Sequence, residues 1–201
     1  RCESPAMPGS GDTEAAEADA PNPEEITMND AKRTTASEMP SGIKGLHHNA
    51  YRCRDSEETR RFYEDFLGMR LAGVLEIEET KTDRSVNALH TFFEMQNGSY
   101  LAFFEVPDSP YDFHDWHDYD LHIALEVDYN HMLAMKAKGE AAGMDVRGVA
   151  DHHFIHSIYF RDPNGYVIEL TARLDNHDIA MDPTCNEART KLDGWQAAKV
   201  N

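Results

Sequence analysis

One strand-and-helix pattern occurs twice in this chain, and each copy begins with a strand that carries histidine. The first copy opens with LHHNAYRCRD at Leu46, and the second opens with LHIALEVD at Leu121. Each is followed by a helical stretch that ends in Gly-Met, at residues 68–69 and 143–144. A repeated unit of this kind cannot bury its apolar face alone, so we expect the two copies to pack as one domain.

The repeat divides the chain into three regions. Residues 1–43 are rich in Glu, Asp, Ala, Pro, Ser and Thr, have almost no aliphatic periodicity, and are predicted to be a disordered leader. Residues 44–174 are predicted to form an α+β domain of two βαβββ modules, at about 44–107 and 120–174. Residues 175–201 form a tail. A short helix is predicted near 186–198, and its Leu192 and Trp195 could dock on the domain.

The charge of the chain limits its partners and its location. Acidic residues number 37 against 19 Lys plus Arg, which gives a net charge of −18. Such a charge repels nucleic acid and anionic membranes. No run approaches the roughly 18 apolar residues of a membrane span, and no early segment has the pattern of a secretion signal. We therefore expect a soluble, cytoplasmic protein that does not bind nucleic acid or membranes.

Strand alternation predicts which polar side chains meet. His122 and Ala124 share one face of their strand, Glu169 faces the same way on the last strand, and His48 is the counterpart of His122 in the first module. A lone inward histidine is more often a hydrogen-bonded core residue than a ligand. Two histidines at matched positions with a carboxylate favour a divalent metal such as Fe(II), Mn(II) or Zn. Glu169 lies in the apolar run YVIEL, where a buried carboxylate needs a cation or a strong donor.

Three segments resemble the vicinal oxygen chelate superfamily: LHHNAYRCRDSEETRRFYEDFLGM, DLHIALEVD and IYFRDPNGYVIEL. This superfamily includes glyoxalase I, fosfomycin-resistance thiol transferases, methylmalonyl-CoA epimerase, bleomycin-binding proteins and type I extradiol dioxygenases. The resemblance covers about residues 44–174. It implies an open, barrel-like cleft around a divalent metal with His48, His122 and Glu169 as ligands. His47 is the alternative to His48, although strand parity with Ala50 favours His48.

The last part of the domain is similar to type I extradiol dioxygenases, in which a His, an aliphatic-Tyr pair and Asp-Pro-x-Gly precede the Glu ligand. Here these are His152, Ile158-Tyr159, residues 162–165 and Glu169, while Ala150 departs from the usual pattern. The resemblance implies an Fe(II)-dependent enzyme, with Mn, Zn or Ni as alternatives, that cleaves the ring of a catechol-like small molecule with O2. His152 and Tyr159 would stabilise developing negative charge. We also expect a homodimer.

The loop at residues 107–120 adds two further candidates, since this family carries an acid–base histidine before its second ligand. His114 and His117 both lie in the loop, and either one fits that role. Both also fit exposed loop residues, and Tyr159 also fits a packed aromatic. From the parity of Ile158 we expect His152 and His156 to lie together, with His153 opposite.

Other reactions of the superfamily depend on the fourth strand, SYLAFFEVP. Alignment of the two Asn-Gly turns places Phe103 opposite Glu169 and leaves Glu105 two residues further on the same face. Glu105 is therefore not expected to be an obligatory ligand. If it were, a glyoxalase I-like or epimerase-like lyase or isomerase would be favoured. A non-catalytic ligand-binding module is the third alternative.

Overall fold

The computed structural model describes residues 42–79 and 85–199. Nearly all of the predicted leader, residues 1–43, lies outside the described residues. The fold class predicted from the repeat is confirmed, because each half has the order β-α-β-β-β. The first module consists of β1 (His48–Arg52), α1 (Ser56–Arg60), η1 (Arg61–Phe66), β2 (Arg70–Glu79), β3 (Ser85–Glu94) and β4 (Tyr100–Glu105). The second consists of β5 (His122–Glu126), α2 (Tyr129–Ala141), β6 (Arg147–Asp151), β7 (Ile155–Arg161) and β8 (Val167–Arg173).

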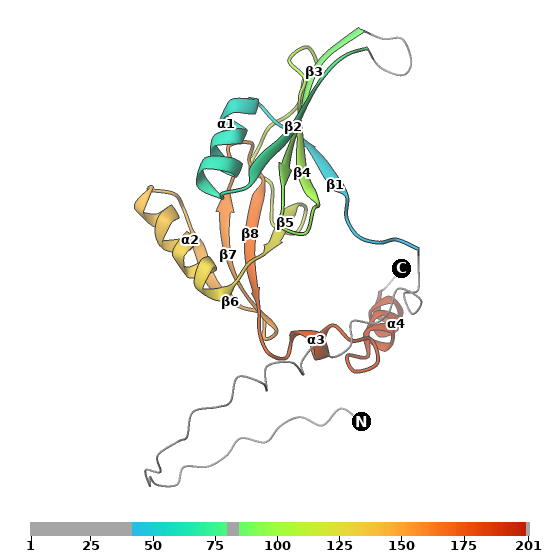
Figure 1. Ribbon diagram of the computed structural model, residues 1–201. Helices are drawn as coiled ribbons and strands as arrows, with labels where there is room; N and C mark the ends of the chain where they lie inside the picture. Colours follow the sequence, from blue (N-terminus) through green and yellow to red (C-terminus); the bar gives the residue numbers. More distant parts are fainter. Residues whose placement is uncertain (1–41, 80–84, 200–201) are drawn as a thin grey trace, which may run out of the picture. The chain divides into compact units, whose positions relative to one another are not determined.

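Each module forms its own four-stranded mixed sheet (Figure 1), and the two sheets have the same strand order. The orders are β1-β4-β3-β2 and β5-β8-β7-β6. In each sheet the first strand of the module runs parallel to the last, and the remaining pairs are antiparallel. The repeat in the sequence therefore corresponds to a repeat in topology, and it places the first and last strands of each module side by side.

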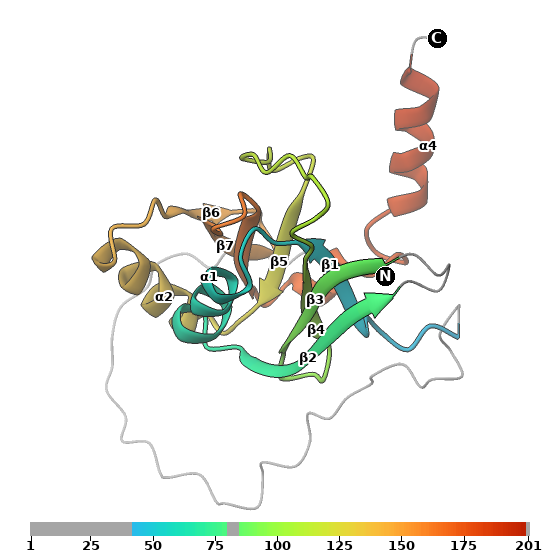
Figure 2. The same cartoon turned by 90° about the horizontal axis from the view of Figure 1, so that it is seen from above.

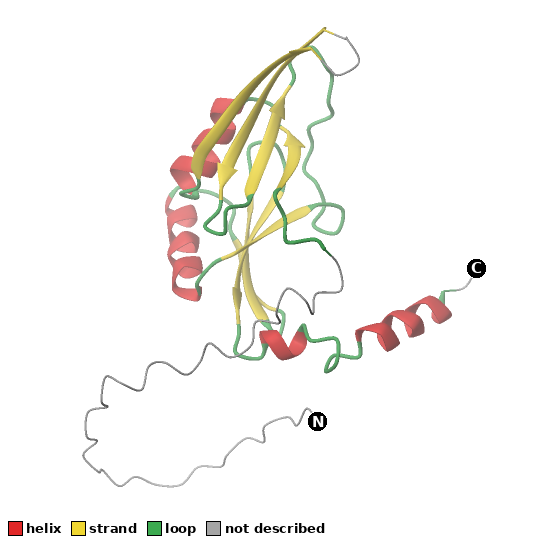
Figure 3. Cartoon of the chain, turned by 45° about the vertical axis from the view of Figure 1, so that its right-hand side comes forward, coloured by secondary structure: helices red, strands yellow, loops and turns green. Residues whose placement is uncertain are grey.

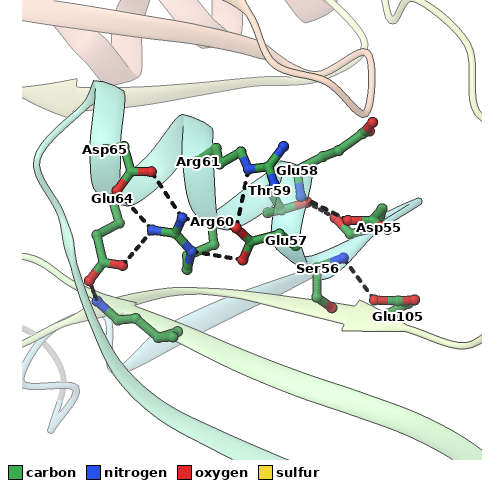
Figure 4. A network of polar contacts seen from close by, with 11 residues as sticks. Asp55, Ser56, Glu57, Glu58, Thr59, Arg60, Arg61, Glu64, Asp65 and Glu105 are labelled. Carbon is green, nitrogen blue, oxygen red and sulfur yellow. Dashed lines mark hydrogen bonds and ion pairs between the residues drawn. The ribbon is translucent and has the colours of Figure 1, made fainter.

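The helix of the first module begins and ends as its sequence predicts. Asp55 is the N-cap, and its carboxylate accepts a hydrogen bond of 2.8 Å from the backbone N–H of Glu58 (Figure 4). The helix continues through η1 to Gly68, whose φ of 82° stops it. On the outer face, Arg60 binds three carboxylates, which belong to Glu57, Glu64 and Asp65.

The two modules share one hydrophobic core, and their helices lie next to one another (Figures 1 and 3). The aliphatic side of β5 faces this core, as predicted, and Ile123 is buried in it. Phe66 from η1 contacts Phe160 from β7 with ring centroids 5.4 Å apart. The Nζ atom of Lys138 in α2 donates to the carbonyl oxygen of Phe66 at 2.6 Å. Packing between the modules therefore buries the side of each sheet that the helices cover.

The Asp-Pro-Asn-Gly turn at residues 162–165 joins the modules through buried hydrogen bonds. Tyr63 donates to Asp162 at 3.0 Å, and the side chain of Asn164 donates to Thr59 at 3.2 Å and accepts from the backbone N–H of Arg54 at 2.8 Å. Burial raises the pKa of Asp162, because the carboxylate has been removed from water. The turn predicted from its sequence is thus also the polar centre of the junction between the modules.

The loop at residues 107–120 is fixed to this same turn. The backbone N–H of Trp116 donates to the carbonyl oxygen of Gly165 at 3.1 Å, and Arg161 donates to the carbonyl oxygens of both residues. Gly165 has a φ of 95°, and a Cβ atom there would overlap the carbonyl oxygen of His114. A glycine is therefore required both for the turn and for the close approach of the loop.

The tail contains α3 (His177–Ala180) and α4 (Ala188–Ala198), seen in a second direction in Figure 2. Leu192 and Trp195, for which a contact with the domain is predicted, are 50% and 68% exposed. Their spacing makes one apolar stripe on α4, which sequence reasoning took for a core contact. No helix among the described residues is long and apolar enough to span a membrane.

Candidate functional site

A pair of polar side chains lies on the second sheet, on the side away from the helices. Ala124 of β5 is the partner of Glu169 of β8 in the parallel ladder, as the alternation predicted. The Nε2 atom of His122 lies 3.5 Å from Oε2 of Glu169. The carboxylate side chain is only 7% exposed, whereas the imidazole is 46% exposed. The sheet therefore holds a buried carboxylate beside an imidazole that solvent and small molecules can reach.

The second nitrogen of His122 determines its tautomer. Nδ1 lies 2.7 Å from the backbone carbonyl oxygen of Asp118. A carbonyl only accepts, so we assign the proton of a neutral imidazole to Nδ1. Nε2 then presents a lone pair towards the carboxylate of Glu169, and two acceptors face each other. A positive charge between them, either a proton or a metal cation, resolves this contact.

Tyr159 and His152 extend the pair into a hydrogen-bonded chain. The hydroxyl of Tyr159 lies 3.3 Å from Oε1 of Glu169 and 2.8 Å from Nε2 of His152. Burial, followed by the charge of Glu169, raises the pKa of Tyr159, so its phenol keeps its proton at neutral pH. The hydroxyl therefore donates to Glu169 while His152 donates to the phenolic oxygen. Four of the predicted site residues form one connected chain.

A further ion pair supports this chain from the side of β6. The guanidinium of Arg147 donates to both carboxylate oxygens of Asp118, at 3.1 and 2.9 Å, and its Cζ lies 5.4 Å from the centre of the Tyr159 ring. Asp118 is thus held in place while its carbonyl orients His122. Sequence reasoning found neither Arg147 nor Asp118, because their contacts join a loop to a strand 29 residues later.

The third predicted ligand, His48, lies on the other sheet. Its ring contacts are with His47, His90 and Phe92 of the first module. Its Nδ1 atom lies 2.8 Å from Nδ1 of His47, which was the alternative ligand. Within residues 42–79 and 85–199, no three His, Cys, Asp or Glu side chains gather closely enough to hold a metal ion. The described chain therefore brings His122 and Glu169 together and leaves His48 apart from them.

The two loop histidines lie outside the hydrogen-bonded chain. Nδ1 of His114 is 3.1 Å from the carbonyl oxygen of Asp112, and its ring lies against Trp116 with centroids 4.3 Å apart. Nδ1 of His117 accepts a hydrogen bond of 3.1 Å from the backbone N–H of Tyr119. His117 precedes Asp118, the residue that orients His122. The loop thus connects to the pair by its backbone.

The alignment that placed Phe103 opposite Glu169 is wrong by one residue. Ala102 pairs with Ala50 in the first sheet just as Glu169 pairs with Ala124 in the second, so Ala102 is the counterpart of Glu169. Phe103 is fully buried and belongs to the core. Glu105 lies two residues after Phe103, on the same face of β4. It accepts a hydrogen bond of 2.7 Å from the backbone N–H of Ser56 at the start of α1 (Figure 4). The extra residue assumed in the turn caused the shift.

The parity prediction for the histidine cluster is also wrong. His152 lies in the turn before β7 and contacts Tyr159, whereas His156 is on the opposite face of β7, with its ring 5.5 Å from that of Tyr129. Strand alternation does not extend through a turn. His90, which sequence reasoning missed, is 7% exposed and stacks on Phe104 with centroids 3.6 Å apart. The sequence feature that could have identified His90 is its spacing from Phe92, which places both side chains on one face of β3.

The fold and the His–Glu pair define a class of protein. The family model for the Glyoxalase/Bleomycin resistance protein/Dioxygenase superfamily matches residues 45–170. The chain belongs to this superfamily. No curated protein matches this sequence.

Solved structures show the same fold. One is a glyoxalase/dioxygenase from Nostoc punctiforme, with 21% identity and a TM-score of 0.52 over 68% of this chain and 96% of that one. A glyoxylase/bleomycin resistance protein/dioxygenase domain from Frankia sp. EAN1pec has 15% identity and a TM-score of 0.54 over 66% and 99%. The genomically encoded fosfomycin resistance protein FosX from Listeria monocytogenes has 20% identity and a TM-score of 0.51 over 67% and 98%. At these identities the likeness concerns the fold alone.

Proposed function

We propose that this protein is a metal-dependent enzyme and that His122, Glu169 and His48 hold its divalent metal. The observation that carries the proposal is the contact of 3.5 Å between Nε2 of His122 and the buried carboxylate of Glu169. Because Nδ1 is occupied by a backbone carbonyl, Nε2 has a lone pair to offer. An imidazole and a carboxylate suit Fe(II), which we favour, and also Mn, Zn or Ni.

For the reaction we propose cleavage of a catechol-like ring with O2. A bound Fe(II) would supply Lewis-acid and redox chemistry at the substrate. The chain's own contribution is the relay from His152 through Tyr159 to Glu169, with contacts of 2.8 and 3.3 Å. The Tyr159 hydroxyl holds a proton that it can donate towards negative charge developing beside Glu169, and His152 can replace that proton.

His48 is the third donor in this proposal, and a homodimer is part of it. His48 lies on the exposed side of the first sheet, apart from His122 and Glu169. A second copy of the chain can therefore present His48 to the pair. Mixing a His48→Ala variant with a His122→Ala variant tests this arrangement. If the donors come from two copies, the mixture regains metal binding that neither variant shows alone.

An isomerase or lyase of the glyoxalase I or epimerase type is the second candidate. It is favoured by the position of His114 and His117, neither of which contacts the hydrogen-bonded chain among the described residues. In that case Glu169 itself would move a proton on the substrate, with Tyr159 as its hydrogen-bond donor.

Metal content and O2 consumption decide between these functions. Anaerobic purification followed by elemental analysis should find iron, and a panel of catechols should then stimulate O2 uptake. Zn or Ni with isomerase activity and no O2 uptake would favour the second candidate. A protein that takes up no metal from Fe(II), Mn(II), Zn or Ni would contradict both and leave a non-catalytic ligand-binding module.

The relay has its own test. Tyr159→Phe should keep metal and fold but lower turnover by about 10²-fold or more, the usual scale of proton-transfer assistance. Tyr129→Phe is the matched control, because Tyr129 is a half-exposed tyrosine at the start of α2, outside the relay. Unchanged turnover in Tyr159→Phe would remove the relay from the mechanism.

A further inference from the structure

Two arginines in this acidic protein have no carboxylate partner in the described residues, and they line the same cavity. Seven of the nine arginines in residues 42–79 and 85–199 have a side-chain nitrogen within 4.0 Å of a carboxylate oxygen. These seven are Arg60, Arg61, Arg70, Arg147, Arg161, Arg173 and Arg189. The two that remain are Arg52 and Arg54. The chain contains 37 acidic residues, so a shortage of carboxylates does not explain why these two arginines lack a partner.

The cavity has a volume of about 220 Å³ and lies between the β1–α1 turn and the segment that follows β4. Arg52 is the last residue of β1, Arg54 lies in the turn that follows, and Tyr111 and Phe113 come from the segment. Each guanidinium lies over one of these rings, with Arg52 over Tyr111 and Arg54 over Phe113, both at 5.2 Å. The rings also contact one another with centroids 4.7 Å apart. These cation–π contacts hold both guanidinium groups at the wall of the cavity.

A buried donor in this cavity has no acceptor. One terminal nitrogen of Arg52 donates to the carbonyl oxygens of Val106 and Ser109, at 3.1 and 2.7 Å. Its Nε–H is buried and has no hydrogen-bond partner in the described residues. A buried N–H without an acceptor is uncommon, so the chain's own residues leave the Arg52 guanidinium incompletely satisfied.

The remaining groups of the cavity do not cancel this positive charge. Burial raises the pKa of the Cys53 thiol to about 11, so Cys53 is uncharged at neutral pH. Glu105 is the one carboxylate among the lining residues, and its Oε2 is already bound to the N–H of Ser56. Two guanidinium groups therefore share the cavity with a single carboxylate, which leaves a net positive charge on its lining.

We propose that this cavity binds a small oxyanion, a phosphate or carboxylate group carried by a small molecule. The guanidinium groups of Arg52 and Arg54 supply the positive charge and the N–H donors that such a group binds. The site is separate from the His122–Glu169 pair, and the inference does not rest on the proposed function.

Titration with inorganic phosphate and with benzoate, at constant ionic strength and followed by two-dimensional NMR, tests the proposal. At least one of the two probes should cause saturating shifts at the amides of Arg54, Ser109 and Phe113. Arg54→Gln should weaken binding about tenfold or more, because a hydrogen bond to a charged group is lost. Arg54 is exposed, so the variant should fold, which circular dichroism verifies.

The matched control is Arg189→Gln, which removes the same charge from an exposed position on α4. It should bind both probes as the wild type does, and Arg54→Gln should keep its metal content. The inference is wrong if neither probe saturates, if the shifts map elsewhere, or if Arg54→Gln binds as tightly as the wild type. Tighter binding of benzoate than of phosphate would assign the oxyanion to an aromatic carboxylate.

Discussion

His122 and Glu169 approach within 3.5 Å on neighbouring strands although 47 residues separate them in the sequence. The approach depends on Ala124, the ladder partner of Glu169, since a small side chain there leaves room for the imidazole next to it. The orientation depends on Asp118, whose carbonyl oxygen binds Nδ1 of His122. The small side chain of Ala124 and the backbone carbonyl of Asp118 thus determine how His122 is placed beside Glu169.

The first prediction concerns metal binding by this pair. Glu169→Gln keeps the shape of the side chain but removes the charge that faces Nε2, and His122→Ala removes the lone pair. Loss of a hydrogen bond that supports a metal ligand typically lowers metal affinity by roughly 10–100-fold. Each of these variants loses a ligand itself, so its metal affinity should fall by more than that. The measurement is metal content after dialysis against a limiting chelator, with His131→Ala, an exposed histidine on α2, as the control. Full occupancy in both variants would contradict the assignment.

Strand parity correctly predicted that His122 and Glu169 lie together, because a β-strand alternates strictly and both residues lie inside regular strands. The same rule failed for His152, which lies in a turn. The assignment of Phe103 failed for a different reason, because the aligned turns were assumed to differ by one residue. Repeat position, which predicted His48 opposite His122, did not bring His48 to the His122–Glu169 pair. The turn at 162–165 was predictable from its residues, but its role in joining the modules through Tyr63 and Asn164 was not, since those contacts span about a hundred residues.

The second prediction concerns Glu105, the last residue of β4, whose carboxylate binds the start of α1. Its carboxylate accepts from the N–H of Ser56 at 2.7 Å, and negative charge at a helix N-terminus is favourable. Glu105→Ala should lower the free energy of unfolding by about 1–2 kcal/mol, and Glu105→Gln, which keeps an acceptor oxygen, by less. Denaturant melts measure both. Metal content should be unchanged in the two variants, and its loss would favour the four-ligand isomerase.

The third prediction concerns the junction between the modules. Tyr63 is fully buried and donates to Asp162 at 3.0 Å, while Asp162 keeps its bonds from the backbone N–H groups of Asn164 and Tyr166. Tyr63→Phe should therefore lower the free energy of unfolding by about 1–2 kcal/mol rather than unfold the protein. Tyr129→Phe should cost almost nothing in the same urea melts. Equal stability of the two variants would show that the Tyr63 bond contributes little to the junction.

The fourth prediction concerns pH. Burial, with a smaller effect of His48, lowers the pKa of His90 below its usual value of about 6.5. The unfolded chain therefore binds a proton more readily than the folded chain, so the stabilisation from neutral His90 is present above about pH 6.5 and is lost as the pH falls through the folded pKa. The ring stacks on Phe104, and its Nε2 is buried without a partner among the described residues.

Replacing His90 with Phe keeps an aromatic ring and removes the titration. We expect the melting temperature of His90→Phe to fall less than that of the wild type between about pH 7.5 and pH 5.5. Other histidines titrate in the same range, so the measured quantity is the difference between the two proteins at each pH. A constant difference across the range would exclude His90 as a source of acid sensitivity.

The fifth prediction concerns the loop histidines, of which we expect His117 to be the proton-transfer group. Its Nδ1 accepts from the N–H of Tyr119, so in the neutral ring its proton lies on Nε2, and the next residue, Asp118, orients His122. His114 is directed to Asp112 and Trp116 instead. With the true substrate, His117→Ala should lower turnover by roughly 10²–10⁴-fold with metal retained, and His114→Ala should have little effect. The reverse result would assign the role to His114. Normal turnover in both variants would show that the loop supplies no proton-transfer group, and the relay of His152 and Tyr159 would then have to provide it.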